Sequence, residues 1–387
     1  MKPITENTAT PLTAITPINP LRKPTSQSEG GGFYNVPTGT ATHLIHETLL
    51  AGEHIADLPA RKSHYNRHAT IKVQESGQRR QITYTTQKAE LTLELADIDK
   101  LTGSNKPAKK LFIYTLIKAN EQAIFSGELG RDYVSFPLQD LVSTGSYSRL
   151  ENARKGFNAG LSALTSLKVK GTIRPSKKKE RTISALEVLF TGGSIKNNQC
   201  TIYLNPRINW GFIVEYFTIL PRYYFSLPNR AADLLYYIFY RARQSTHEIE
   251  QKGYFTISFR AIQERLQLPS EKGLNNPQRD IKDRIEEAIT AIEDRHHAIY
   301  NNMEFSLLPV YDDKAPISEY LDNGYLQVSL SGDFATKFIE LSQDTTKAIE
   351  SRQKQRQRIT EKAIALNMSK KLEADSDTGG DEPPPTD

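Results

Sequence analysis

An internal duplication constrains the fold of this chain more than any other feature of its sequence. The segment TISFRAIQERL (Thr256–Leu266) has a looser copy, YVSFPLQDLV (Tyr133–Val142), earlier in the chain. The match extends upstream, where LFIYTLIKAN begins at Leu111 and LLYYIFYRAR begins at Leu234, 123 residues later. Because a match held at one offset indicates a repeated structural unit, the chain is predicted to contain one module twice.

Both copies predict the same order of elements: an apolar helix, a strand, a short helix, a turn and a long helix. Downstream, GLSALTSL from Gly160 matches AITAIEDR from Ala288, and each is followed by strands. A three-helix core with a helix-turn-helix, closed by a β-hairpin, is a winged helix. We therefore predict an α+β fold with two tandem winged-helix domains and disordered N- and C-terminal tails.

Composition sets the predicted domain boundaries. Residues 1–65, rich in Thr, Pro, Ser and Gly, are expected to be disordered or weakly ordered. The first winged-helix domain is assigned to 66–205 and the second to 206–335. A basic C-terminal helix is expected over 336–372, and an acidic disordered tail over 373–387.

The charges are unevenly distributed. The chain has a net charge of +5, and the tail Glu373–Asp387 holds six acids and no base, which leaves +11 on the rest. A basic body with an acidic tail favours a polyanionic partner such as nucleic acid, although a solvated surface would look the same. No apolar run approaches the roughly 18 residues that cross a bilayer. With no secretory signal pattern and the single Cys200, a cytoplasmic protein without membrane contact is expected.

The long helix of the first module is the clearest candidate for reading DNA. SRLE (Ser148–Glu151) predicts a capping box at its start. Small residues on the outward face, Gly156 and Ala159, would let the backbone approach a groove. The predicted buried stripe is Leu150, Ala153, Phe157, Leu161 and Leu164. The predicted DNA contacts are Ser148, Arg149, Asn152 and Lys155, with an ordinary polar helix face as the alternative.

The long helix of the second module is predicted to begin with Asn276 as N-cap and Pro277 as its first residue. Its outward face continues to Asp283 and Glu286, whose carboxylates repel phosphate, so base contact is expected only from the first turn. The predicted buried stripe is Ile281, Ile285, Ala288, Ile289 and Ile292. The predicted DNA contacts are Lys272, Asn275, Asn276, Arg279, Lys282 and Arg284.

The most basic stretch, KVKGTIRPSKKKER (Lys168–Arg181), holds seven bases and one acid. It is predicted to form the first wing and to lie along phosphates or in the minor groove. The predicted contacts are Lys170, Arg174, Lys177, Lys178, Lys179 and Arg181. A solvated loop or an import-like basic run is the alternative. The aromatic segment Asn205–Arg230 is predicted to pack the two modules together.

No pattern in the sequence indicates an enzyme. There is no G-x-x-x-x-G-K phosphate loop, no metal-ligand set and no carboxylate pair that stands out. The nearest candidate for a nicking site is DRHHAIY, with His296, His297 and Tyr300. Its adjacent histidines are expected to point in different directions. We therefore expect no catalysis, no metal and no cofactor.

Two tandem modules of this kind resemble the winged-helix replication initiator proteins of theta-replicating bacterial plasmids. The resemblance covers about Ala89–Ser331 and is carried by KKLFIYTLIKAN, YVSFPLQDLV, RLENARKGFNAGLSALTSL, FTILPRYYFSLP and TISFRAIQERL. It implies sequence-specific binding to double-stranded DNA at iteron-like repeats of a plasmid origin, initiation of replication and autorepression. It also implies a homodimer in equilibrium with a monomer, a dimer face on the first module, and host partners such as a helicase. Carried over, the contacts would be Arg149, Asn152 and Lys155 in the first module, and Asn276 and Arg279 in the second.

Three other functions remain open at this point. A winged-helix transcription regulator would bind promoter operators without melting an origin. A nicking enzyme would cleave DNA with a metal ion and would lose activity on Tyr300→Phe. An assembly protein would use its winged helices only for contacts with other proteins.

Overall fold

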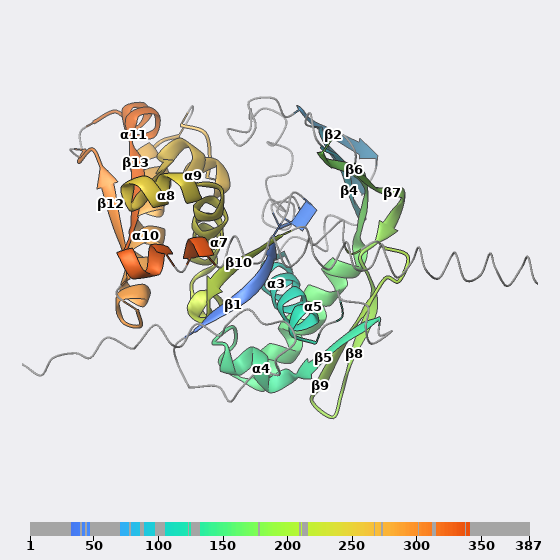
Figure 1. The fold of residues 1–387 in the computed structure, drawn as a ribbon. Coiled ribbons are helices and arrows are strands. Elements are labelled where there is room, and N and C mark those ends of the chain that lie inside the picture. The colour runs from blue at the N-terminus through green and yellow to red at the C-terminus, as the bar shows by residue number, and fades with distance from the viewer. Residues whose placement is uncertain are drawn as a thin grey trace, which may run out of the picture.

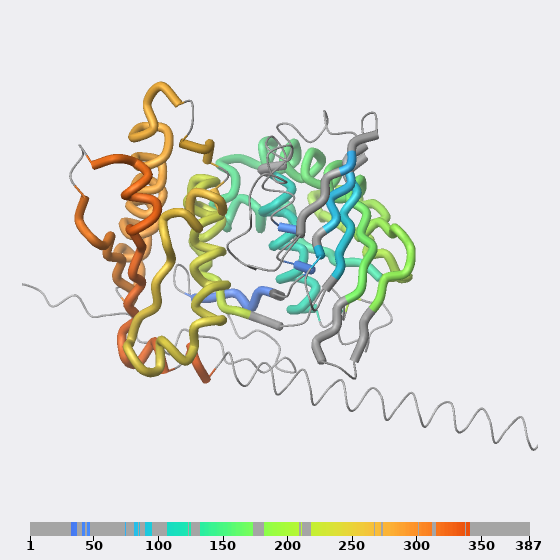
Figure 2. The backbone as a smooth tube through the Cα atoms, turned by 90° about the horizontal axis from the view of Figure 1, so that it is seen from above, coloured from blue at the N-terminus to red at the C-terminus, as the bar shows by residue number. Residues whose placement is uncertain are grey.

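The computed structural model describes most of the two predicted modules and parts of the N-terminal region (Figures 1 and 2). The described residues are 32–38, 41–42, 45–46, 70–76, 79–85, 89–96, 105–122, 124, 132–176, 179–208, 210, 216–266, 268–271, 274–300, 302–311, 315–336 and 338–340. They form helices and antiparallel sheets, as expected of an α+β chain. None of the helices among them is long and apolar enough to span a membrane. The predicted acidic tail and nearly all of the predicted C-terminal helix lie outside the described residues.

The first module contains the predicted order of elements. Its helices pack around the aromatic side chains of Tyr114, Phe136 and Phe157. Strand β9 is central in a three-stranded sheet, so the chain order β5, β8, β9 becomes the spatial order β5-β9-β8. The elements are α3 (Asn105–Glu121), β5 (Tyr133–Pro137), α4 (Leu138–Ser143), α5 (Leu150–Ser166), β8 (Phe190–Lys196) and β9 (Gln199–Leu204).

The second module repeats this arrangement. Its sheet has the order β11-β13-β12, so the last strand is again central. The shared elements are α7 (Asn229–Gln244), β11 (Tyr254–Ser258), α9 (Phe259–Arg265), the π-helical turn η5 (Gln278–Asp283), α10 (Arg284–His297), β12 (Met303–Leu308) and β13 (Tyr325–Leu330). Two short helices, α8 (Thr246–Lys252) and α11 (Ile317–Asn323), are additions to the shared order. The duplication predicted from the sequence is therefore present in the topology.

A five-stranded sheet is inserted in the first module, and it corrects the prediction for the basic stretch. Strand β6 starts directly after α5 and pairs with β4, so that Val169 lies opposite Leu93. The basic stretch thus extends a separate sheet, and the hairpin β8–β9 closes the module. The sequence pattern showed strands but did not specify their partners. The strands are β2 (Thr70–Ser76), β3 (Arg79–Thr85), β4 (Ala89–Ala96), β6 (Leu167–Ser176) and β7 (Lys179–Val188), in the order β2-β3-β4-β6-β7.

The predicted lack of order in the N-terminal region is wrong at residues 41–42 and 45–46, which are helical and buried, and at one strand. Residues Phe33–Thr38 form strand β1, which pairs antiparallel with β10 (Tyr216–Pro221). Val36 is completely buried, and the Phe33 ring stacks on Phe334 with centroids 5.6 Å apart. A low-complexity composition hides this strand because its few apolar residues lie among Thr, Pro and Gly.

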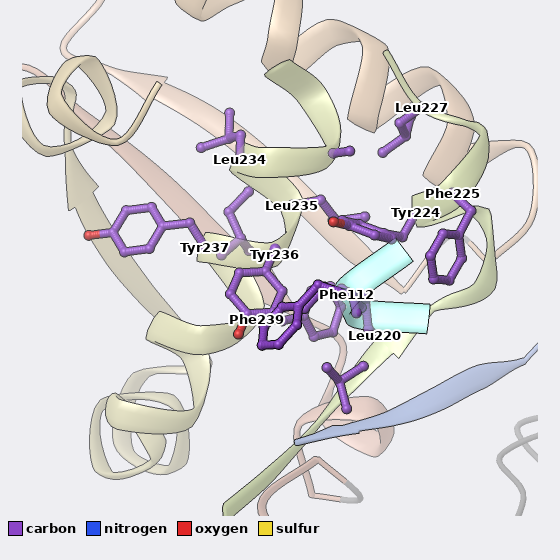
Figure 3. Close-up of a cluster of buried hydrophobic side chains, with 14 of the residues drawn as sticks. Phe112, Leu220, Tyr224, Phe225, Leu227, Leu234, Leu235, Tyr236, Tyr237 and Phe239 are labelled. Carbon is purple, nitrogen blue, oxygen red and sulfur yellow. The ribbon is translucent and has the colours of Figure 1, made fainter. Parts of the chain in front are cut away.

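The seam between the modules is built from α3, the 3-10 helix η4 (Arg222–Ser226) and α7. Phe112, Tyr224 and Phe225 are buried there beside the apolar face of α7 (Figure 3). Nζ of Lys109 lies 2.6 Å from Oδ2 of Asp233, and the two side chains are 5% and 3% exposed. Of the segment Asn205–Arg230, predicted to pack the modules together, Phe225 and Leu227 contact the first module, through Lys110 and Tyr114.

Candidate nucleic-acid interface

Helix α5 begins one residue later than predicted and without a capping box. Its N-cap is Arg149, in an extended conformation, and no side chain caps the first turn. Leu150, predicted to be buried, is 40% exposed because it is the first helical residue, beyond the reach of the packed turns. Farther along, Ala153, Phe157 and Leu164 are buried as predicted.

Four predicted contacts come together on one exposed surface at the start of α5. Ser148, Arg149, Asn152 and Lys155 are all exposed. Nδ2 of Asn152 donates to Oγ of Ser148 over 3.4 Å. Lys155 forms an exposed ion pair with Glu151, with Nζ and Oε1 2.7 Å apart. Since Glu151 offsets the charge of Lys155, Arg149 is the main cation of this surface.

Gly156 does not face outward, contrary to the prediction. It is buried, and a Cβ at this position would overlap the ring of Tyr147. Burial raises the pKa of Tyr147 to about 12. Gly156 is therefore required by the packing of the Tyr147 ring across the helix. The first turn of α5 is then the part of the helix that could approach a DNA groove.

The basic hairpin β6–β7 begins at the opposite end of α5 from these residues. Lys170 is exposed on the polar face of the five-stranded sheet. That face also holds Thr172 and Thr182, whose hydroxyl groups are 3.2 Å apart. Arg174, Lys179 and Arg181 belong to β6 and β7, while Lys177 and Lys178 lie outside the described residues. Only Lys170 can therefore be placed as an exposed cation.

The hairpin that closes the first module was missed as a candidate wing. Asn197 and Asn198 adopt left-handed conformations, with φ of 49° and 58°, which form a tight turn between β8 and β9. Nη2 of Arg154 on α5 donates to Oδ1 of Asn198 over 2.9 Å. The Asn-Asn pair in the sequence was the signal that could have located this turn.

The second long helix begins as predicted. Oδ1 of Asn276 accepts from the backbone N–H of Arg279 over 3.2 Å, and Pro277 is the first helical residue. Asn275, Asn276 and Arg279 are exposed together at this end. The predicted buried stripe is confirmed for Ile281, Ile285, Ala288, Ile289 and Ile292.

Lys282 was predicted to reach the DNA backbone but is only 7% exposed. Its Nζ lies 5.9 Å from the centre of the Tyr320 ring, so the ammonium group makes a cation–π contact within the second module. Arg284 is partly exposed, and its Nη2 is 3.9 Å from Oδ1 of Asp280. Asp280 also pairs with Nε of Arg279 at 3.2 Å. Lys272 lies outside the described residues.

The residues considered for a nicking site have structural contacts. The hydroxyl of Tyr300 donates to the carbonyl of Gly32 over 2.6 Å and accepts from the Gly32 N–H at 2.5 Å. His296 is buried and lies 2.8 Å from both the Tyr223 hydroxyl and Oδ1 of Asn302, and burial lowers its pKa to about 4. His297 is exposed. Among the residues that the structure describes, no three His, Cys, Asp or Glu side chains form a metal-binding group.

Comparison with known proteins does not establish a family. No family model matches the sequence, and no curated protein matches it. The fold is similar to the crystal structure of RctB domains 2-3, at 8% identity and a TM-score of 0.35 over 69% of this chain and 93% of that chain. A second crystal structure, of selenomethionine derivatives of domains 2 and 3 of RctB, matches at 9% identity and a TM-score of 0.34, over 73% and 98%. Likeness at this level carries no argument about the fold or function of this chain.

Proposed function

We propose that this chain binds double-stranded DNA sequence-specifically at repeats of a plasmid origin and initiates replication there. The observation that carries the proposal is the duplicated topology. Each module has the order of a winged helix, and each three-stranded sheet has its last strand in the centre. In both modules the long third helix occupies the position of a recognition helix and exposes polar residues at its N-terminal end.

In the first module, α5 carries the chemistry that base reading requires. Asn152 can form two hydrogen bonds with adenine in the major groove, and Arg149 can bind guanine or phosphate. The helix N-terminus adds a partial positive charge that favours a nearby phosphate. Because Glu151 pairs with Lys155, we assign Lys155 a weaker role than the other two residues.

In the second module, the DNA contacts are confined to the first turn. Asn275, Asn276 and Arg279 are exposed there, whereas Lys282 is buried. Asp283 is exposed one turn farther along and would repel phosphate. The second module therefore contributes a short contact to the same duplex.

The proposed sequence of events requires no chemistry by this chain. Copies assemble on the repeats, open an adjacent A·T-rich tract, and recruit host proteins such as the replicative helicase. A homodimer in equilibrium with the monomer would repress the chain's own gene. The hydroxyl of Tyr300, the candidate nucleophile of DRHHAIY, donates to the backbone carbonyl of Gly32.

The proposal is tested by selecting duplexes from a random pool with the full-length chain. We expect a selected site of about 20 base pairs, two turns of the duplex, since each module reads one groove segment. Direct repeats of this site should occur beside the coding region. In a plasmid carrying them, permanganate should detect unpaired thymines only when the protein is present. Binding at the chain's promoter without unpaired thymines would support the regulator instead.

A matched pair of variants tests the assignment of α5. Asn152→Ala should weaken binding to the selected site by about 1–3 kcal/mol and relax the preference at one base pair. Asn158→Ala, an exposed asparagine on another face of α5, should bind as the wild type does. Equal binding by both variants would overturn the assignment.

A further inference from the structure

The short helix α11, which the second module adds to the shared order, packs against both helices of that module's helix-turn-helix. The ring of Tyr320, in α11, stacks on Phe259 of α9 with centroids 4.3 Å apart, and the two helices lie side by side (Figure 1). Nζ of Lys282, in η5, lies 5.9 Å from the centre of the same ring. Nε2 of Gln278, at the start of η5, donates to the carbonyl of Ala315, just before α11, over 2.8 Å. Helix α11 therefore holds α9 and the start of the recognition helix together.

Arg260, in α9, joins α11 to the connection between α9 and η5. Its Nη1 donates to both carboxylate oxygens of Glu271, in that connection, over 3.0 and 2.9 Å. Its Nε donates to Oδ1 of Asp322, in α11, over 3.0 Å. Because the donors of a guanidinium group have a fixed planar geometry, these bonds set directions as well as distances.

A buried glutamine extends this network along the connection. Gln263 is 4% exposed, and its Nε2 donates to the carbonyl of Pro269 over 2.7 Å. The backbone N–H of Leu268 donates to the carbonyl of Gln263 over 3.0 Å. Since Nη1 of Arg260 also donates to Oε1 of Gln263 over 3.3 Å, the two side chains hold the connection as one hydrogen-bonded unit.

The first module has a different arrangement at the same place. The offset of 123 residues that relates the two copies puts Pro137 opposite Arg260. Pro137 is the exposed N-cap of α4, and a proline side chain donates no hydrogen bond. There the Tyr147 ring packs on Gly156 of the recognition helix. The network around Arg260 is thus a feature of the second module, whose exposed contact is confined to one helical turn.

We propose that Arg260 is a positioning residue, which sets the first turn of the second recognition helix, with Asn276 and Arg279, at the angle that base reading requires. This inference rests on the proposed DNA-binding function. Arg260 acts through Glu271 and Asp322 and makes no contact with DNA itself. A side chain that reads a base must be held to within about 0.5 Å, and hydrogen bonds from neighbouring residues provide that precision.

The base preference of the second module tests the inference. The full-length chain is titrated against the selected duplex and against duplexes with one base pair changed in either protected segment, where Asn152→Ala identifies the segment of the first module. In the wild type each change should weaken binding about 5- to 150-fold. In Arg260→Gln the penalty should fall below about threefold in the second module's segment and persist in the other.

Arg241→Gln is the matched control, because Nη1 of Arg241 likewise donates to a glutamine three residues along, Gln244, over 3.1 Å. Both penalties should keep their wild-type values in this variant. Arg241 lies in the last turn of α7, away from the helix-turn-helix of the second module.

Two further measurements separate positioning from direct contact with DNA. Glu271→Gln should show the same relaxed preference as Arg260→Gln, and the double variant should lose nothing more, because both changes break one interaction. The slope of log K against log salt should keep its wild-type value in Arg260→Gln. A slope reduced by about 0.9 would make Arg260 a phosphate ligand and overturn the inference.

The outcomes distinguish the inference from the proposed function. If the wild type binds no duplex, the proposed function fails and the inference with it. If the wild type binds but Arg260→Gln keeps both penalties, or loses both to the same extent, only the inference is overturned.

Discussion

Nζ of Lys109 and Oδ2 of Asp233 lie 2.6 Å apart, and this ion pair joins the first helix of one module to the first helix of the other. Both side chains are almost completely buried. An ion pair in this position contributes little net stability, because both charges lose their hydration. Removing only one partner, however, leaves the other charge buried and uncompensated.

Asp233→Asn should therefore lower the free energy of unfolding by roughly 3–5 kcal/mol. The double variant Lys109→Met, Asp233→Leu removes both charges at similar volume and should recover most of that loss. The measurement is urea denaturation followed by circular dichroism. Glu151→Gln, which breaks the exposed pair with Lys155, is the control and should change stability by less than about 1 kcal/mol. Similar losses from the buried and exposed variants would contradict this account of the seam.

The packing of Tyr147 over Gly156 predicts opposite effects of one substitution in two backgrounds. In the wild type, Gly156→Ala should destabilise the chain by about 1–3 kcal/mol, because the added methyl group overlaps the Tyr147 ring. In a Tyr147→Ala background, the same substitution should stabilise by about 0.5–1 kcal/mol, since alanine favours the helix. Thermal denaturation of the four proteins measures both values. The same sign in both backgrounds would show that the ring does not require the glycine.

Tyr300→Phe separates a structural tyrosine from a nucleophile. The variant loses the hydroxyl that both donates to and accepts from the backbone of Gly32, so its stability should fall by about 1–3 kcal/mol. Binding to the selected duplex should persist at temperatures where the variant is folded. Tyr203→Phe, at an exposed tyrosine, should leave stability unchanged. A metal-dependent nicking activity on supercoiled DNA that disappears in Tyr300→Phe would support the enzyme instead.

His296 predicts how stability depends on pH. Burial lowers the pKa of this imidazole from 6.5 to about 4, so between these values the unfolded chain binds a proton that the folded chain does not. Stability therefore falls as the pH drops through this window, by roughly 2 kcal/mol between pH 6.5 and pH 5. The measurement compares the free energy of unfolding of the wild type with that of His296→Gln at these two pH values. His297→Gln, at the exposed neighbour, removes only the smallest of the causes that shift the His296 pKa, so it should keep most of the wild-type dependence. A shared dependence in all three proteins would contradict the assignment.

The sequence predicted the elements whose patterns are local. The stripe from Ile281 to Ile292 is buried because side chains at helical spacing share one face. The cap by Asn276 was equally readable, since a capping side chain and the backbone N–H that donates to it are three residues apart. The repeat predicted the order of elements in both modules, because the same pattern occurs in each copy.

The features that the sequence did not predict depend on contacts with residues outside their own helix or strand. Nothing in the basic stretch specifies that β6 pairs with β4, because a strand pattern fixes a face and not a neighbour. The burial of Lys282 depends on the ring of Tyr320, and that of Gly156 on Tyr147.

The pairing of β1 with β10 also has a consequence for synthesis on the ribosome. Since β10 follows β1 by roughly 180 residues, it leaves the ribosome roughly 10 to 35 s later, at about 5–20 residues per second. During that interval Phe33 and Val36 have no strand to cover them, although the first module can already fold. Strand β1, which is made before either module, is therefore among the last elements to be incorporated, and the two modules come to be held together only when translation is far advanced.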